Sequence, residues 1–231
     1  MGPHDHLKLV DLGLQPLLPR LSAPAAARPS QRSLPADLGA LLDAQPDGTS
    51  DVTICVGGRR FHVHRAILSA RCDYFKQRLA NDGFADASAA ELELPDADAD
   101  AFALLLRWLY TGVADIPSDE LARGVAELAD RLLLSELCTT ALEVVAASVT
   151  TGTAVDCLLW AAGCSESRDG GGGFGELVAQ LKEWYVSHHE EVAAEAGDSR
   201  ALLAARAPLV MVQLMDAIVK RDGRDRKRTR A

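Results

Sequence analysis

The stretch DVTICVGGRRFHVHRAIL, residues 51–68, decides the fold of this chain. From Val52 to Val56 every second residue is a branched aliphatic one, which is the pattern of a strand with one buried face. The pair Gly57-Gly58 supplies the positive φ angles that a two-residue hairpin turn requires. Residues 60–63 continue as the partner strand, and the chain turns into a helix after His64. We therefore expect a β-hairpin that leads directly into a helix.

The next 45 residues continue this pattern of short strands and helices. Residues 71–80 predict a helix that buries aromatic side chains, and residues 92–94 predict another short strand. The alternate aspartates of 96–100 indicate the entry to a helix, because carboxylates favour the positive end of the helix dipole. The helix itself is predicted over 101–110, and Gly112 is placed to end it. The segment as a whole indicates an α+β domain.

The order of these signals resembles a BTB (POZ) domain. The matching residues are Asp51-Val52-Thr53, Phe61, His64–Leu68, Tyr74-Phe75, Leu92–Leu94 and Tyr110-Thr111-Gly112. The resemblance implies an α+β BTB/POZ fold, with a small β-sheet flanked by helices. The helices expected after Thr151 resemble the BACK-type extension that follows many BTB domains.

Four segments follow from this interpretation. Residues 1–33 are expected to be a flexible arm, because five prolines interrupt them. Residues 34–150 are expected to form the BTB/POZ domain with an N-terminal dimerisation helix, and residues 151–219 the all-helical BACK-like extension. In the last helix, opened by Pro208, we expect four side chains to point inward: Met211, Leu214, Met215 and Ile218. Residues 220–231 are expected to be a basic tail.

The segment before the predicted hairpin carries one apolar stripe at helical spacing, formed by Leu34, Leu38, Leu41 and Leu42. A helix of three turns cannot form stably without burying such a stripe. The segment resembles the helix that precedes the BTB core in the MATH-BTB proteins, the speckle-type POZ group, where it packs across a two-fold axis. The resemblance implies a homodimer that buries these leucines. The alternative is a helix that folds back on its own domain.

The resemblance also implies a partner. BTB proteins of the MATH-BTB and Kelch-type groups are substrate adaptors for cullin-3 ubiquitin ligases, and a hydrophobic-x-Glu motif grips the cullin. Phe84-Ala85-Asp86 stands at that place, with Asp one methylene shorter than Glu. Leu109 and Tyr110 are expected to lie on the same side as further cullin-binding residues. The alternative is that Phe84 only closes its loop and that Asp86 is solvated.

Charge and composition exclude several other classes of protein. The chain has 231 residues and a formal net charge of −9, so an acidic body argues against nucleic acid as a partner. No apolar run approaches the ~20 residues that span a bilayer, so we expect no membrane partner. Five widely spaced cysteines without a C-x-x-C pair favour reduced thiols over a disulfide or zinc framework.

No catalytic or metal-binding constellation is recognisable. His62 and His64 are two residues apart, but no ligand at metal spacing lies near them, so hydrogen-bonded structural histidines are expected. No nucleophile elbow, P-loop or zincin motif is present. We therefore expect a non-enzymatic protein without metal or cofactor.

These expectations define a function. The protein is expected to be a dimeric substrate adaptor of a cullin-3 type E3 ubiquitin ligase, with an unknown substrate protein. The 33 arm residues are too few for a MATH sandwich, so the part that reads the substrate is not recognisable. Arg226-Lys227-Arg228 predict a nuclear-import signal, and hence a nuclear and/or cytoplasmic protein. The alternatives are a solvated tail, and a BTB dimerisation scaffold or transcriptional co-regulator without a ligase.

Overall fold

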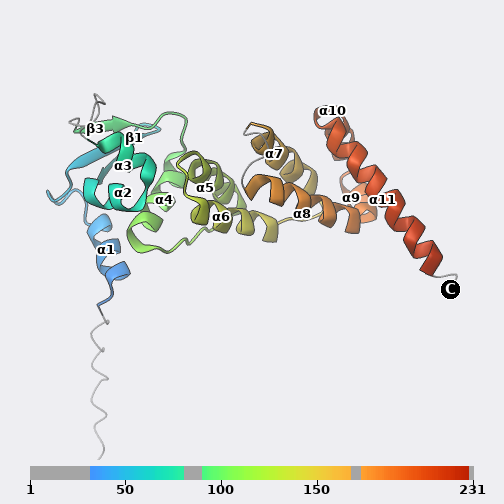
Figure 1. Ribbon diagram of the computed structural model, residues 1–231, viewed down its shortest axis with the longest axis horizontal. Coiled ribbons are helices and arrows are strands. Elements are labelled where there is room, and N and C mark those ends of the chain that lie inside the picture. The colour runs from blue at the N-terminus through green and yellow to red at the C-terminus, as the bar shows by residue number, and fades with distance from the viewer. Residues whose placement is uncertain (1–31, 81–89, 168–172, 229–231) are drawn as a thin grey trace, which may run out of the picture. The chain divides into compact units, whose positions relative to one another are not determined.

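The computed structural model describes residues 32–80, 90–167 and 173–228, and in the last helix it describes side chains as far as Arg221. Residues from Leu34 onward belong to one compact unit. Its elements (Figure 1) are, in order, α1 Leu34–Asp43, β1 Val52–Val56, β2 Arg59–Val63, α2 Arg65–Arg71, α3 Asp73–Leu79, β3 Glu91–Glu93, α4 Ala99–Thr111, α5 Asp119–Arg131, α6 Ser135–Ala147, α7 Ala154–Glu166, α8 Gly173–Ser187, α9 His189–Glu195, α10 Gly197–Arg206 and α11 Pro208–Arg228.

The described strands form a mixed sheet in the order β2-β1-β3. β1 pairs antiparallel with β2 and parallel with β3, so that Ile54 lies opposite both Phe61 and Leu92. The predicted hairpin is confirmed, because Gly57 and Gly58 have φ angles of 55° and 81°. The alternation along β1 is also confirmed, since its three branched aliphatic side chains are buried. The prediction of an α+β fold with a helical extension is therefore correct.

The helix expected after His64 and the helix expected over 71–80 are both present, as α2 and α3. Cys72 separates α2 from α3 and has an extended backbone, with φ −144° and ψ 115°. Its N–H donates to Leu68 O at 2.9 Å, and its carbonyl accepts from Lys76 N at 2.9 Å. One extended residue thus supplies the last bond of α2 and the first bond of α3. The second helix therefore begins at Asp73, two residues later than the sequence predicted.

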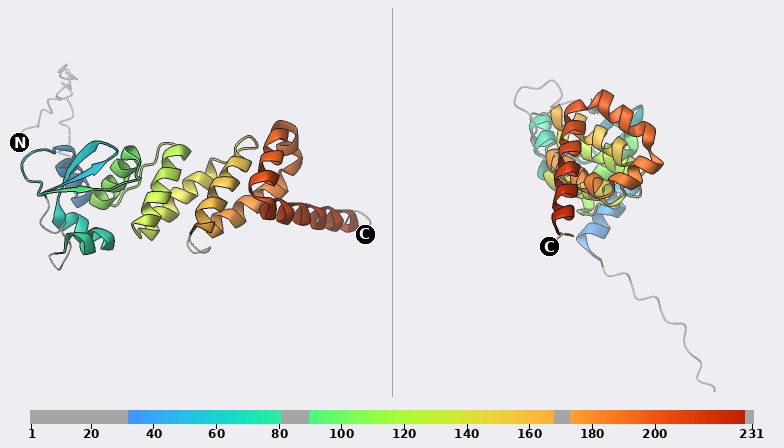
Figure 2. Two further views of the ribbon diagram at one scale, coloured as in Figure 1. Left: turned by 90° about the horizontal axis from the view of Figure 1, so that it is seen from above. Right: turned by 90° about the vertical axis from the view of Figure 1, so that its right-hand side faces the viewer.

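The long helix α4 is fixed at both ends by the residues that the sequence indicated. The Asp98 carboxylate accepts from the N–H groups of Asp100 and Ala101, at 3.0 and 2.8 Å. At the other end Gly112 adopts the left-handed conformation, with φ 72°. Between the two caps Phe102 is fully buried and meets the Phe61 ring edge-on at 5.1 Å. This contact joins α4 to the sheet, which Figure 2 shows beside it.

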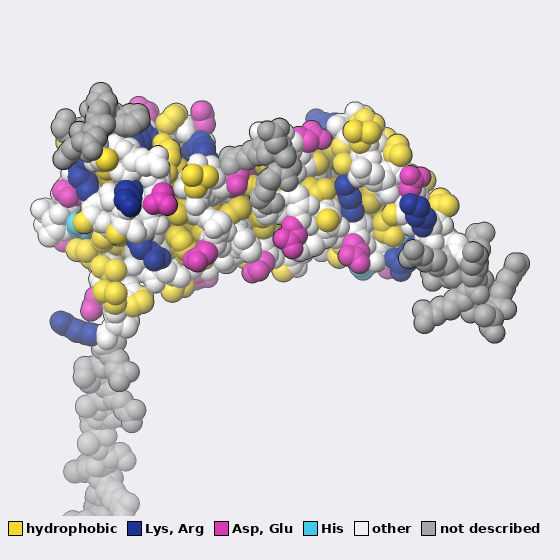
Figure 3. Space-filling view, in the orientation of Figure 1, with side chains coloured by type: hydrophobic (Ala, Val, Ile, Leu, Met, Phe, Trp, Pro, Cys, Tyr) yellow, Lys and Arg dark blue, Asp and Glu magenta, His cyan; other side chains and the backbone are white. Residues whose placement is uncertain are grey.

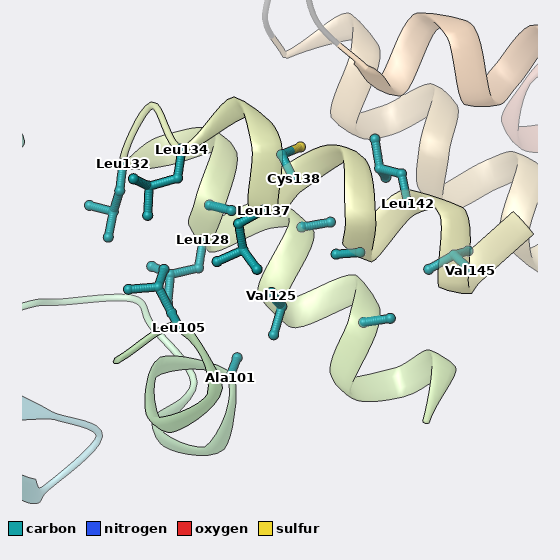
Figure 4. Close-up of a cluster of buried hydrophobic side chains, with 14 of the residues drawn as sticks. Ala101, Leu105, Val125, Leu128, Leu132, Leu134, Leu137, Cys138, Leu142 and Val145 are labelled. Carbon is teal, nitrogen blue, oxygen red and sulfur yellow. The ribbon is translucent and has the colours of Figure 1, made fainter. Parts of the chain in front are cut away.

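α4, α5 and α6 enclose the apolar cluster of Figure 4, in which side chains of the three helices point toward one another. Gly124 of α5 allows a close approach, because a Cβ there would lie 3.2 Å from the Cβ of Ala101 in α4. Ser118 caps α5 as predicted, and its Oγ accepts from Leu121 N at 3.3 Å. This cluster continues the core of the sheet into the helices that follow.

The extension is held to the earlier helices by a cation in α5. Arg123 donates to Asp156 Oδ2 in α7 at 2.9 Å, and its guanidinium lies 5.3 Å from the Trp160 ring centroid. α7 packs on α8 and α10, and α8 also packs on α6 and α11. Leu214 of α11 is buried, but Met215 is 42% exposed, so the prediction that it points inward was wrong. The reason is that α11 carries apolar residues on two opposite faces, and only one of them is covered.

Candidate protein-interaction site

A hydrogen-bonded pair fixes the entry to α2 against the end of α4. The Tyr110 hydroxyl accepts from the His64 N–H at 3.0 Å and lies 2.9 Å from His64 Nδ1. On its other side His64 Nε2 lies 3.0 Å from Thr49 Oγ1. The expectation of a hydrogen-bonded structural histidine at 64 is met. The pair joins residues 46 positions apart and thereby positions α2 and α3.

The same geometry corrects the prediction for the end of α4. The sequence placed Leu109 and Tyr110 on a surface for cullin, yet they are only 1% and 3% exposed. The Leu109 side chain lies in the core, and its carbonyl accepts from Arg71 Nε at 3.2 Å. The Tyr110 hydroxyl is used inside the domain by His64. Neither side chain is offered to a partner in this conformation.

Replacing Tyr110 with Phe is expected to destabilise the fold by about 1–3 kcal/mol, because the half-buried His64 N–H then loses its acceptor. Burial raises the pKa of Tyr110 to about 12. The unfolded phenol ionises near pH 10.0 and the folded one near 12, so stability falls as pH rises through this window. Denaturant unfolding of the wild type and the Phe variant at neutral pH and at pH 10–12 tests both points. The difference between the two proteins should shrink toward the upper end of the window, whereas a constant difference would contradict the assignment.

The predicted dimerisation helix forms α1, and it lies against α4 of its own chain. Leu38, Leu41 and Leu42 are half-buried against the core, and Arg107 of α4 forms an ion pair with Asp43. Leu34 remains 71% exposed. The helix therefore has a supported inner side and an apolar N-terminal turn that the described part of the chain leaves exposed. A dimer through this turn stays a prediction.

Phe84-Ala85-Asp86 lie outside the described residues, within 81–89. The elements on either side of that segment are described and are tied together. Arg78 of α3 donates to the Tyr74 hydroxyl at 2.9 Å and to Glu93 O of β3 at 2.9 Å. This single side chain joins α3 to β3, which are the elements that precede and follow residues 81–89. The two elements that flank residues 81–89 are therefore tied to each other by a hydrogen-bonded side chain.

An exposed leucine between α5 and α6 was missed by the sequence reasoning. Leu133 is 78% exposed and has a φ of 60°, a backbone conformation that is unfavourable for a leucine. The turn lies beside the start of α3, since Cys72 Sγ donates to Leu132 O at 3.7 Å. The signal in the sequence was the run Leu132-Leu133-Leu134, because three successive apolar residues cannot share one helix face. Strained apolar residues at a surface are features to test for partner binding.

Leu133→Gly is expected to stabilise the protein by about 0.5–1 kcal/mol, because glycine adopts a positive φ without steric cost. The measurement is the midpoint of urea unfolding. Val113→Gly is the matched control, since Val113 is also an exposed branched residue at 57% but has no positive φ. That control should be neutral or destabilising. Equal effects of the two substitutions would show that backbone strain at Leu133 is not the cause.

The candidate metal ligands of the sequence do not converge in the described part of the chain. His62 Nδ1 lies 3.1 Å from Thr53 Oγ1, so its ring is turned to a different partner from that of His64. Within the described residues no group of three or more His, Cys, Asp or Glu side chains is placed to hold a metal ion. All five cysteines are free thiols. No helix in the described ranges has the length and apolar character that a membrane crossing requires.

The predicted nuclear signal lies at the end of α11. The backbone of Arg226, Lys227 and Arg228 is helical, and their side chains are outside the described part of the structure. The boundary predicted before residue 220 therefore falls inside a helix. Proline is absent from this stretch, so nothing in it prevents the helix from continuing past Ile218. The nuclear function of this cluster stays a prediction.

Comparison with known proteins agrees with this geometry. Residues 42–147 match the BTB/POZ domain family. BTB/POZ domain-containing protein 9 of Rattus norvegicus is 42% identical over 83 residues, which make up 36% of this chain and 13% of that protein. Kelch-like protein 11 of Homo sapiens is 31% identical over 96 residues, 38% of this chain and 13% of that protein. The chain thus matches only a small part of the length of these relatives.

One relative matches a longer segment. BTB and MATH domain-containing protein 41 of Caenorhabditis elegans is 28% identical over 170 residues, 71% of this chain and 38% of that protein. An alignment of this length reaches beyond residues 42–147, so it includes helices outside the family match. The hairpin, the α2–α3 pair and the capped α4 lie within residues 42–147, the segment that matches the family. The chain therefore carries a BTB/POZ domain, a protein-interaction module, at residues 42–147.

Proposed function

We propose that this protein is a substrate-adaptor subunit of a cullin-3 type E3 ubiquitin ligase and that it acts as a homodimer. The observation that carries the proposal is the similarity to a BTB and MATH domain-containing protein over 71% of the chain. That similarity extends past the BTB/POZ domain into the helical extension, which is the arrangement of the adaptor group that the sequence resembles. Binding of cullin-3 is assigned to residues 81–89. The substrate is a protein of unknown identity.

The proposed contact has a simple physical basis. An aromatic anchor that enters an apolar pocket, with a carboxylate beside it, is the usual form of an interface hot spot. Phe84 is the anchor and Asp86 is the carboxylate. The Arg78 bridge between α3 and β3 supports this role, because it fixes the two elements that flank the segment. Flanking elements that are tied together lower the entropy cost of ordering the segment on a partner.

Binding of a purified cullin-3 N-terminal fragment, measured by calorimetry, tests the proposal. The Phe84→Ala/Asp86→Ala variant should lose at least about 30-fold in affinity, the equivalent of removing one hot spot. Asp86→Glu restores the hydrophobic-x-Glu motif and should bind at least as tightly as the wild type. A matched control is present in the chain: Val113-Ala114-Asp115 has the same hydrophobic-Ala-acid pattern at an exposed position.

Val113→Ala/Asp115→Ala should leave cullin binding unchanged. If only this control lost binding, the cullin contact would have to be assigned to the turn after α4. A wild type that forms a dimer but does not bind the fragment would support the alternative of a BTB scaffold without a ligase. The proposal also includes the cellular location of the protein. The basic cluster at the end of α11 is assigned to nuclear import, so the protein would be found in the nucleus and/or the cytoplasm.

A further inference from the structure

A groove runs between the last turns of α8 and the middle of α11. Its volume is about 570 Å³, which lies within the range of ligand-binding pockets in proteins. Its apolar lining includes Val186 of α8 and Leu214 and Ala217 of α11. Leu214 is buried, while the other two are half-buried, so the lining is anchored in the core and still reachable. All residues that line this groove lie in the described part of the chain.

Two polar bridges cross between the helices along the groove. Lys182 Nζ donates to Gln213 Oε1 at 2.6 Å, and Arg221 donates to the carbonyl of Val186 at 3.0 Å. Both cations therefore use neutral acceptors. A carboxylate is a stronger acceptor for an ammonium or guanidinium group than an amide oxygen is. A ligand carboxylate at either end would thus gain a charge-assisted hydrogen bond.

The charge of the groove is opposite to that of the protein. The lining contains Lys182, Lys220 and Arg221 against one acid, Glu183, while the whole chain has a formal net charge of −9. In the described ranges no ion pair joins any of these three cations to a carboxylate. In Figure 3, Lys and Arg side chains lie over the α11 end of the face that is shown, with Asp and Glu side chains among them. The site is a basic groove with an apolar floor in an acidic protein.

We propose that this groove binds an acidic peptide segment of another protein. One bulky apolar side chain of the peptide lies against Leu214 and Ala217, and carboxylates on either side of it meet Lys182 at one end and Lys220 with Arg221 at the other. Charge complementarity selects an acidic partner, and the apolar floor together with Glu183 disfavours a uniform polyanion such as nucleic acid. That the peptide belongs to the substrate rests on the proposed adaptor function.

Fluorescence anisotropy with a labelled peptide of about ten residues tests the site. The probe carries a central leucine with glutamates on both sides, and its companions replace the leucine with alanine or every glutamate with lysine. Lys182→Glu/Lys220→Glu should weaken binding of the probe at least about tenfold, since two ion pairs become repulsive. Ala217→Trp fills the floor and should weaken binding without any change of charge, and thermal unfolding checks that this variant is folded.

The matched control is Lys76→Glu/Arg206→Glu, which reverses two exposed cations outside the groove. It should retain binding within about twofold, because only long-range attraction changes. Equal loss in this control, or equal binding of the lysine peptide, would overturn the proposal. Tighter binding of a single-stranded oligonucleotide than of the acidic peptide would also overturn it.

The groove and the proposed cullin contact can be tested apart. Lys182→Glu/Lys220→Glu should bind the cullin-3 fragment like the wild type, and Phe84→Ala/Asp86→Ala should bind the acidic peptide like the wild type. Peptide binding without any cullin binding would leave the groove standing and remove the adaptor function. Cullin binding without peptide binding would remove the groove proposal and leave the adaptor function standing.

Discussion

Replacement of Leu34 and Leu38 with Glu is expected to convert the protein from a dimer to a monomer. Leu34 is 71% exposed in the single chain, although it belongs to the same apolar stripe as the half-buried Leu38. In a two-fold pair each substitution is present twice, so four carboxylates would enter an apolar seam. An unpaired buried charge costs several kcal/mol, so the dimer dissociation constant should rise by at least about three orders of magnitude. Sedimentation velocity at micromolar protein concentration measures the change as a halving of the mass.

The single variant Leu34→Glu separates assembly from folding. Its side chain lies in solvent in the monomer, so thermal stability of the monomer should stay within the ±0.5 kcal/mol typical of surface substitutions. Leu209→Glu is the matched control, because Leu209 is a leucine of α11 with 75% exposure. A mass that changes with Leu209 and not with Leu34 would place the self-association on α11. A monomeric wild type would remove the dimer proposal altogether.

The sequence predicted well those features of the structure that depend on neighbouring residues. Alternation from Val52 to Val56, the Gly57-Gly58 turn and the Gly112 cap depend on neighbouring residues, and the structure has all three. Each of these features is encoded within a few positions, because backbone conformation at glycines and side-chain alternation in strands are local properties. The same reason explains why the BTB/POZ pattern could be recognised before any contact was known.

What failed was the prediction of which apolar residues are covered. Tyr110 looked like a surface aromatic at a helix end, but its burial depends on His64, which is 46 positions away. Met215 lies between covered residues in the sequence, and only the course of α8 and α10 decides that it faces solvent. The groove is a similar case, since Lys182 and Lys220 come from helices far apart in the chain. Helical periodicity indicates a face and not its partner.

Phe102→Ala should cost about 3–5 kcal/mol, the range for truncating a fully buried aromatic side chain. Phe102 has 0% exposure and contacts Phe61 of β2, so the cavity would open between α4 and the sheet. Domains of this size are stable by about 5–15 kcal/mol, so the loss is a large fraction of the total. Urea unfolding measures it, with Phe102→Leu as the control that leaves a smaller cavity and should lose clearly less. A loss below about 1 kcal/mol would mean that the core closes over the site.

The same experiment tests whether the extension unfolds with the BTB/POZ domain. Residues from Leu34 onward form one compact unit, and Arg123 joins α5 to α7 through Asp156. Two of the three tryptophans, Trp160 and Trp184, lie in the extension, so their fluorescence reports on it, whereas circular dichroism reports on all helices. In a single cooperative unit both signals should move together to lower urea when Phe102 is truncated. A fluorescence transition that stays in place would show that the extension is stable without the sheet, and that the core around Phe102 supports only the BTB/POZ domain.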